Sequence, residues 1–143
     1  MHKTVQNLID IENELKSNLK DINILNLPKI IAVSKTFAID KIYPLIDHGH
    51  LDFGENKVQE AIDKWSKIKI EKPNLKLHMV GKLQSNKVKL AVKLFDYIHS
   101  VDSEKLVKKI ADEQLKINKR IKIFLQVNIG DENQKSGINK NDV

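Results

Sequence analysis

Short apolar segments alternate with helix-like segments along this chain, and this alternation most limits the folds it can adopt. Five segments rich in branched or aromatic residues begin near residues 30, 51, 77, 97 and 121. Between them, apolar residues recur at the three- and four-residue spacing of an amphipathic helix. Strands separated by helices in this way are typical of parallel βαβ units, because each helix returns the chain to the same end of the sheet.

Individual elements can be placed on this pattern. An amino-terminal helix is expected, with one face made of Val5, Leu8, Ile9, Glu12, Leu15 and Leu19. The first strand, Ile30 to Val33, is apolar and β-branched throughout, which predicts full burial. Gly49 is expected just beyond the next helix, and Asp102 or Ser103 at the start of the last one. A fifth strand is predicted from the alternating residues Ile121, Ile123, Leu125 and Val127.

Two architectures fit this order of elements, an open doubly wound sheet and a TIM barrel. The fingerprint G-x-G-x-x-G is absent, which disfavours the dinucleotide-binding form of the doubly wound sheet. Polar residues gather where the strands end, so the pattern favours an α/β TIM-barrel-like fold. A complete barrel has eight strands and typically ~250 residues. We therefore expect a single partial barrel domain over residues 1–143, with about five of the eight strands.

Composition excludes several classes of protein. The chain is 41% hydrophobic and 31% charged, so it can bury a core and is not disordered by composition. The absence of cysteine excludes disulfides and thiolate metal sites. The amino terminus lacks the apolar region of a signal peptide, and no apolar run approaches the ~20 residues that span a bilayer. We therefore expect a cytoplasmic protein.

The net charge of +6 raises the question of a nucleic-acid partner. Arg120 is the only arginine, although arginine is the preferred reader of bases and phosphates. The lysines are scattered among acidic residues, and few aromatic residues are present to stack on bases. We expect no nucleic-acid partner, and a nucleic-acid-binding module stays a less favoured alternative.

Ligands of parallel α/β folds bind at the carboxyl ends of the strands, and polar or small residues gather there. These residues are Ser34, Lys35 and Thr36; Gly54, Glu55 and Asn56; His78, Gly81, Lys82, Gln84, Ser85 and Asn86; His99, Ser100 and Asp102; and Gln126, Asn128 and Asp131. Lys35 has the most distinctive chemistry. Desolvation at the end of an apolar strand favours the neutral form of an amine, which is a nucleophile toward aldehydes. Position alone, however, favours an ordinary solvated lysine.

The remaining candidates also have ordinary explanations. On position alone, His78 is more often a satisfied core histidine than a ligand-binding residue. Glu55 and Glu60 flank the start of a helix, whose dipole stabilises carboxylates. His78 and His99 do not have the spacing of a metal site, so we expect no bound metal.

Four segments carry motifs that occur together in one known family. Residues 31–36 contain A-V-S-K-T, and residues 53–60 contain F-G-E-N-x-x-Q-E. Residues 78–87 contain H-x-x-G-x-L-Q-x-N-K, and residues 128–137 contain N-x-x-x-E-x-x-K-x-G. In order and spacing these segments resemble the pyridoxal 5′-phosphate (PLP) homeostasis family (YggS/PROSC-like proteins), and the resemblance covers almost the whole chain.

The resemblance implies the fold of the N-terminal barrel of alanine racemase, PLP fold type III. It also implies that Lys35 holds PLP as a Schiff base, with Asn56, His78 and Asn128 at strand ends facing the cofactor. The family lacks the second racemase domain, which supplies the other catalytic base. Its members are regarded as PLP carriers or regulators without an established reaction. A non-enzymatic role in vitamin B6 homeostasis follows, with a fragment of a racemase-like PLP enzyme as the alternative.

The chain departs from the family pattern in two ways. Leu77 stands where the family usually has an aromatic residue, which affects packing more than chemistry. Members are usually longer, so we expect the last three strands and the loops that grip the phosphate to be missing from these 143 residues. Family members are usually monomers, but unpaired edges lead us to expect self-association of this short form.

Overall fold

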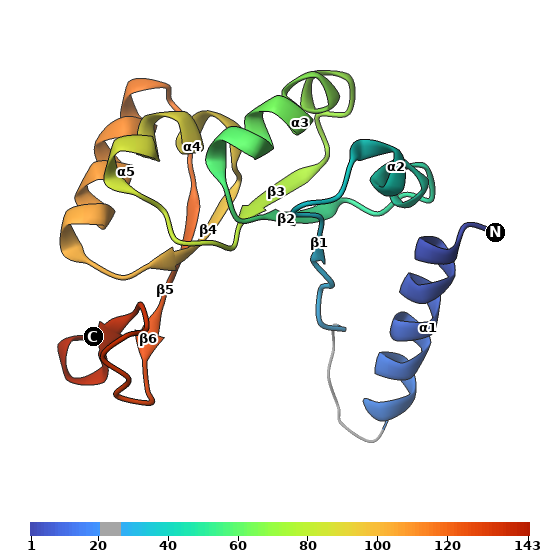
Figure 1. The fold of residues 1–143 in the computed structure, drawn as a ribbon, viewed down its shortest axis with the longest axis horizontal. Helices are drawn as coiled ribbons and strands as arrows, with labels where there is room; N and C mark the ends of the chain where they lie inside the picture. The colour runs from blue at the N-terminus through green and yellow to red at the C-terminus, as the bar shows by residue number, and fades with distance from the viewer. Residues whose placement is uncertain (21–26) are drawn as a thin grey trace.

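The computed structural model describes residues 1–20 and 27–143 (Figure 1). Helix α1 (Lys3–Asn18) begins the chain and buries Val5 and Leu8, which confirms the expected amino-terminal helix. The other described helices are α2 (Ile39–Asp47), α3 (Val58–Glu71), α4 (Val88–Leu94) and α5 (Glu104–Lys116), with short 3-10 turns η1 (Ser85–Lys87) and η2 (Lys140–Asp142). In Figure 1, α3, α4 and α5 lie on the same side of the sheet.

The main sheet contains parallel strands in the order in which they occur along the chain. These are β1 (Ala32–Val33), β2 (Asp52–Glu55), β3 (Lys76–Met79), β4 (Tyr97–Val101) and β5 (Lys122–Leu125). Successive strands are neighbours in a barrel, whereas a doubly wound sheet reverses its strand order at a switch point. The observed order therefore confirms the TIM-barrel-like prediction. In the described residues the sheet stays open, with β1 and β5 as its edges.

The core lies between the sheet and the helices. Phe53, Leu77 and Ile98 come from three successive strands, and none of them is exposed. Trp65 of α3 is also fully buried, and its ring centroid lies 5.0 Å from that of Phe53. Burial of a large apolar side chain contributes roughly 1.5–3 kcal/mol. The apolar face of α3 therefore anchors this helix to the sheet.

Two expected helix boundaries are confirmed. Gly49 follows α2 with a φ of 98°, and its N–H donates to Ile46 O at 3.0 Å. Glycine adopts this left-handed conformation without steric cost, and so it ends the helix. Ser103 begins α5, because its Oγ accepts a hydrogen bond from Leu106 N–H at 3.2 Å.

Both edge strands are partly or fully exposed. β1 is short and Val33 is 48% exposed, so the prediction of a fully buried first strand was wrong. All residues of β5 are exposed, and the strand ends at Leu125. Val127 belongs instead to β6 (Val127–Asn128), which pairs in parallel with β7 (Ile138–Asn139). Apolar sequence predicted these strands correctly, but their burial depends on neighbours that an edge does not have.

Polar and aromatic side chains cover the face of the sheet that points away from the helices. His78 lies between Leu77 and Met79 in sequence and therefore projects to this inner face. Its Nε2 lies 2.9 Å from Asp52 Oδ1, and its Nδ1 lies 2.9 Å from His99 Nε2. Its ring also stacks on Tyr97, with centroids 4.3 Å apart.

Burial lowers the pKa of both histidines on this face. Desolvation disfavours the imidazolium form, and for His78 it outweighs the hydrogen bond and charge of Asp52, which raise the pKa. Desolvation also lowers the pKa of His99, with a smaller contribution from His78. Neutral rings suit the contact between them, because one ring nitrogen must donate and the other accept.

His78 and His99 should make stability depend on pH. Their pKa values are lowered from 6.5 in the folded protein, so the unfolded chain binds more protons as the pH falls below that value. The free energy of unfolding should therefore decrease between about pH 7.5 and about pH 5.5, as measured by urea denaturation. His99→Gln should weaken this dependence, and replacing the exposed His48 with Gln should preserve it. A constant free energy of unfolding in the unaltered protein would contradict the assignment.

The exposed edge should make the 143-residue chain self-associate. Ile123, Phe124 and Leu125 of β5 are 38%, 51% and 53% exposed, and apolar edges of this kind pair with other chains. Size-exclusion chromatography with light scattering should detect oligomers. Leu125→Lys should shift the population toward monomer, because a charged edge side chain opposes pairing. Ile70→Lys, at an 82% exposed position on α3, is the matched control. A monodisperse monomer for the unaltered chain would show that this edge does not drive association.

Candidate functional site

Lys35 lies in a tight turn directly after β1, at the carboxyl end of the sheet. Phe37 N–H donates to Ser34 O at 3.2 Å, and this bond closes the turn around Lys35 and Thr36. Thr36 has a φ of 65°, which is unusual for a β-branched residue. The Lys35 side chain is exposed, so the prediction that it sits at a dry strand boundary was wrong. Its amine is accessible from solvent.

The carboxyl ends of β2, β3 and β4 are held close together next to this turn. Gly81 follows β3, and a Cβ added to it would come within 2.4 Å of Asn56 O, so only glycine fits there. Ser100 Oγ in turn donates to Gly81 O at 2.6 Å. Because Val33 pairs with Gly54, this arrangement sets Asn56 at the strand end next to Lys35.

A fully buried carboxylate lies behind the Lys35 turn. Glu55 is the last residue of β2, and its Oε1 accepts hydrogen bonds from three donors. The donors are Ser34 Oγ at 2.7 Å, Lys64 Nζ at 2.9 Å and Trp65 Nε1 at 2.9 Å. The sequence had suggested an ordinary carboxylate at a helix start, and that interpretation of Glu55 was wrong, because the residue belongs to the strand and points toward α3. Alternation with the buried Phe53 was the signal that could have revealed it.

Glu60 fits its expected place in the first turn of α3. Its Oε1 accepts a hydrogen bond from Thr36 N–H at 2.8 Å, across the gap between helix and turn. This hydrogen bond is the main reason that the pKa of Glu60 is lowered, and the nearby charge of Lys64 adds to it. The carboxylate therefore stays ionised and holds the turn.

Two buried acceptor atoms at this end of the sheet have no hydrogen-bond partner among the described residues. They are Glu55 Oε2 and Asn56 Oδ1. A buried acceptor without a donor costs free energy, which a bound ligand with an O–H or N–H group can recover. PLP carries a phenol O–H, and its aldehyde reacts with amines such as that of Lys35. The donor and acceptor chemistry of these residues therefore fits the cofactor that the sequence motifs imply.

His78 is engaged within the protein. Both of its ring nitrogens have partners, Asp52 and His99, on the inner face of the sheet. The structure thus sets His78 one strand away from Asn56, with no free ring nitrogen for a ligand. These contacts match the ordinary explanation for a buried histidine, in which its ring nitrogens are hydrogen-bonded inside the protein core.

Asn128 lies in a different part of the fold. It belongs to β6, beyond the edge strand β5 and far from β1 in Figure 1. Its side chain closes its own loop, because Nδ2 donates to Glu132 O at 2.8 Å and Oδ1 accepts from Glu132 N–H at 3.4 Å. The described residues thus bring Lys35 and Asn56 to neighbouring strand ends and leave Asn128 apart.

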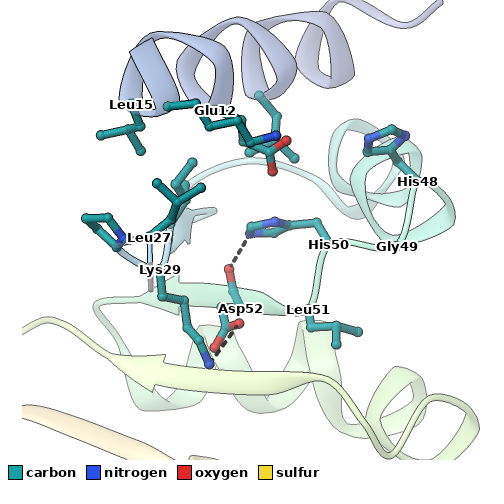
Figure 2. A pocket seen from close by; sticks show the side chains of 13 residues that line it. Glu12, Leu15, Leu27, Lys29, His48, Gly49, His50, Leu51 and Asp52 are labelled. Carbon is teal, nitrogen blue, oxygen red and sulfur yellow. Dashed lines mark hydrogen bonds and ion pairs between the residues drawn. The ribbon is translucent and has the colours of Figure 1, made fainter. Parts of the chain in front are cut away.

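A pocket of about 440 Å³ opens at the opposite, amino-terminal end of the first strands (Figure 2). It lies between α1 and the segments 27–30 and 48–52. His50 Nε2 lies 2.8 Å from Asp52 O, and Lys29 Nζ lies 3.7 Å from Asp52 Oδ2. Ligands of this class of fold bind at the carboxyl ends of strands, so the candidate site stays at the Lys35 end.

Residues 1–20 and 27–143 contain no group of three or more His, Cys, Asp or Glu side chains that could hold a metal ion. Over the same ranges, every helix is too short or too polar to cross a membrane.

Comparison with known proteins assigns this chain to a family. Residues 10–143 match the family model described as alanine racemase, N-terminal domain. The pyridoxal phosphate homeostasis protein of Buchnera aphidicola is 40% identical over 133 residues, which is 92% of this chain and 58% of the relative. The chain spans about half the length of the curated relatives it matches.

Solved structures agree with this assignment. PipY of Synechococcus elongatus, determined without PLP, has a TM-score of 0.75 at 36% identity, covering 90% of this chain and 60% of PipY. The same protein with PLP bound has a TM-score of 0.71 at 35% identity, covering 87% and 58%. The chain therefore belongs to the alanine racemase N-terminal domain family, among relatives named pyridoxal phosphate homeostasis proteins.

Proposed function

We propose that this protein binds PLP through Lys35 and takes part in intracellular PLP homeostasis. The observation that carries the proposal is the position of Lys35, on a closed turn at the carboxyl end of β1. Asn56 stands at the next strand end with a buried oxygen that no described residue satisfies. The names of the relatives and the PLP-bound PipY structure support the same cofactor.

Lys35 is the nucleophile in this proposal, and PLP, when bound, supplies an electrophilic aldehyde. The Lys35 amine would hold the cofactor as a Schiff base, and the aldehyde oxygen would be released as water with both amine protons. Asn56 Oδ1 would accept a hydrogen bond from the bound ligand. His78 supports this end of the sheet through Asp52 and His99, and Asn128, which the motifs predict to face the cofactor, is held in its own loop by hydrogen bonds to Glu132.

We also propose that the site holds the cofactor without catalysing a reaction. Racemisation needs proton-transfer groups placed at the cofactor, with pKa values near the working pH. Of the two carboxylates that hydrogen-bond the Lys35 turn, Glu55 is fully buried against Lys64. The pKa of Glu60 is lowered by its hydrogen bond to Thr36 N–H, which makes it a weaker base. Incubation of the PLP-loaded protein with amino acids in D₂O should give no α-proton exchange, and exchange would favour a racemase-like enzyme.

The proposal includes a cytoplasmic location and no nucleic-acid partner. Several surface lysines pair with neighbouring carboxylates, for example Lys108 with Glu104 at 2.7 Å and Lys135 with Glu132 at 2.9 Å. Such pairing weakens the positive field that attracts phosphate backbones. The absence of cysteine fits a reducing compartment.

The first test maps the lysine that reacts with PLP. After borohydride reduction and peptide mapping, we expect the pyridoxyl label mainly on Lys35. Lys35→Ala should remove the specific visible absorbance while changing stability little, within about 0.5 kcal/mol, because the side chain is exposed. Lys41→Ala, at an exposed position on α2, should retain the label on Lys35. A label distributed evenly over many lysines would refute the assignment.

The second test concerns Asn56 and separates binding from folding. Asn56→Ala removes a buried oxygen that has no partner among the described residues, so the ligand-free protein should keep its stability. PLP affinity should fall about tenfold, because the ligand loses one hydrogen bond. A spectroscopic titration and a urea melt measure the two quantities. Equal affinities in the variant and the unaltered protein would remove Asn56 from the site.

A further inference from the structure

The Lys35 turn has a backbone conformation that needs outside support. Thr36 has a φ of 65°, and a β-branched side chain in this left-handed region is sterically disfavoured. The hydrogen bond inside the turn, from Phe37 N–H to Ser34 O, is 3.2 Å long. A single bond of that length leaves an exposed turn free to relax toward more favourable φ values. The surrounding structure must therefore select this conformation.

Two carboxylates hold the turn from opposite ends. Glu55 Oε1 accepts from Ser34 Oγ at 2.7 Å, at the residue before Lys35. Glu60 Oε1 accepts from Thr36 N–H at 2.8 Å, at the residue after it. Lys35 therefore lies between Ser34, which is hydrogen-bonded to the buried Glu55, and Thr36, which is hydrogen-bonded to the ionised Glu60.

Lys64 connects these contacts. Its Nζ lies 2.9 Å from Ser34 O, 2.9 Å from Glu55 Oε1 and 3.5 Å from Glu60 Oε1. The Lys64 side chain is 10% exposed, so this cation is placed in a low-dielectric position where its charge acts strongly. One lysine of α3 thus neutralises both acids and also binds the backbone of the turn directly.

Docking of α3 does not by itself explain this arrangement. Val58, Ala61, Trp65 and Ile68 are buried and already anchor the helix on the sheet. The contacts of Glu60 and Lys64 go instead to backbone atoms of residues 34 and 36. They fix the turn relative to the helix, and the residue between the two fixed points is Lys35.

We propose that Glu60 and Lys64 are positioning residues that hold the Lys35 turn in place and so direct PLP to this lysine in preference to other exposed lysines. The inference rests on the proposed function and deepens it. Preorganisation lowers the entropic cost of fixing a reactive group, and it favours binding at the fixed site over the same chemistry on mobile side chains. Selectivity for Lys35 then comes from its backbone as well as from groups that touch the ligand.

Glu60→Ala tests this with two independent readouts. Hydrogen exchange at the Thr36 amide reports the turn without any ligand, and it should become about three- to tenfold faster when its acceptor is removed. Pyridoxyl labelling of Lys35 at limiting PLP, relative to all other lysines, should fall by a similar factor of about three to ten. Asp63→Ala is the matched control, because Asp63 is exposed on the same helix and its described hydrogen bond comes from Gln59. It should change neither readout.

Thr36→Gly supplies a rescue. Glycine adopts a positive φ readily, so in a Thr36→Gly background the removal of Glu60 should reduce labelling of Lys35 less than it does with Thr36 present. Unchanged exchange at Thr36 in Glu60→Ala would overturn the proposal, whatever the labelling shows. Faster exchange with undiminished selectivity for Lys35 would also overturn it. If the unaltered protein shows no selective label on Lys35, the proposed function fails, and that outcome is separate from the effect of Glu60 on the turn.

Discussion

The buried carboxylate of Glu55 is the interaction on which the rest of the site depends. It ends β2, receives Trp65 and Lys64 from α3, and binds Ser34 at the start of the Lys35 turn. Breaking a buried charge pair by removing one partner typically costs about 3–5 kcal/mol, because the other charge stays desolvated. The end of the sheet, helix α3 and the Lys35 turn are therefore coupled in one polar unit inside an otherwise apolar layer.

Strand alternation explains how the same sheet supports this unit and a second polar layer. On β2, Phe53 and Glu55 face the helices, while Asp52 and Gly54 face the opposite side. The inner face collects His78 beside Asp52, and burial there keeps the imidazole neutral by lowering its pKa. Gly54 has no side chain on that face, where an added Cβ would come within 3.3 Å of Ile31 just before β1 and Val80 just after β3. The side chains that face the helices hold the Lys35 turn, and the side chains on the opposite face hold the strands together.

The sequence alone predicted the features that follow from local pattern. Periodicity gave the order of helices and strands, the role of Gly49 after α2 and the cap at Ser103. Parallel topology was enough to bring Lys35 and Asn56 to the same end of the sheet. The contacts of Glu55 could not be predicted in this way, because its partners come from β1 and α3 and depend on which face the strand end presents. The full burial predicted for the first strand was wrong for the same reason, because neighbouring elements decide burial and composition does not.

In the proposed function, the distribution of hydrogen bonds around Lys35 distinguishes a cofactor-holding site from a catalytic one. Glu55 and Glu60 are acids that bind the turn, through Ser34 and Thr36, and Glu55 also binds Lys64. Carboxylates held in this way support a backbone conformation, and the lowered pKa of Glu60 makes it a weaker base for proton transfer. The lysine amine itself is left exposed, so it is accessible to an aldehyde while its backbone is fixed. A carrier of a reactive aldehyde requires both features, a fixed backbone at the lysine and an amine that the aldehyde can reach.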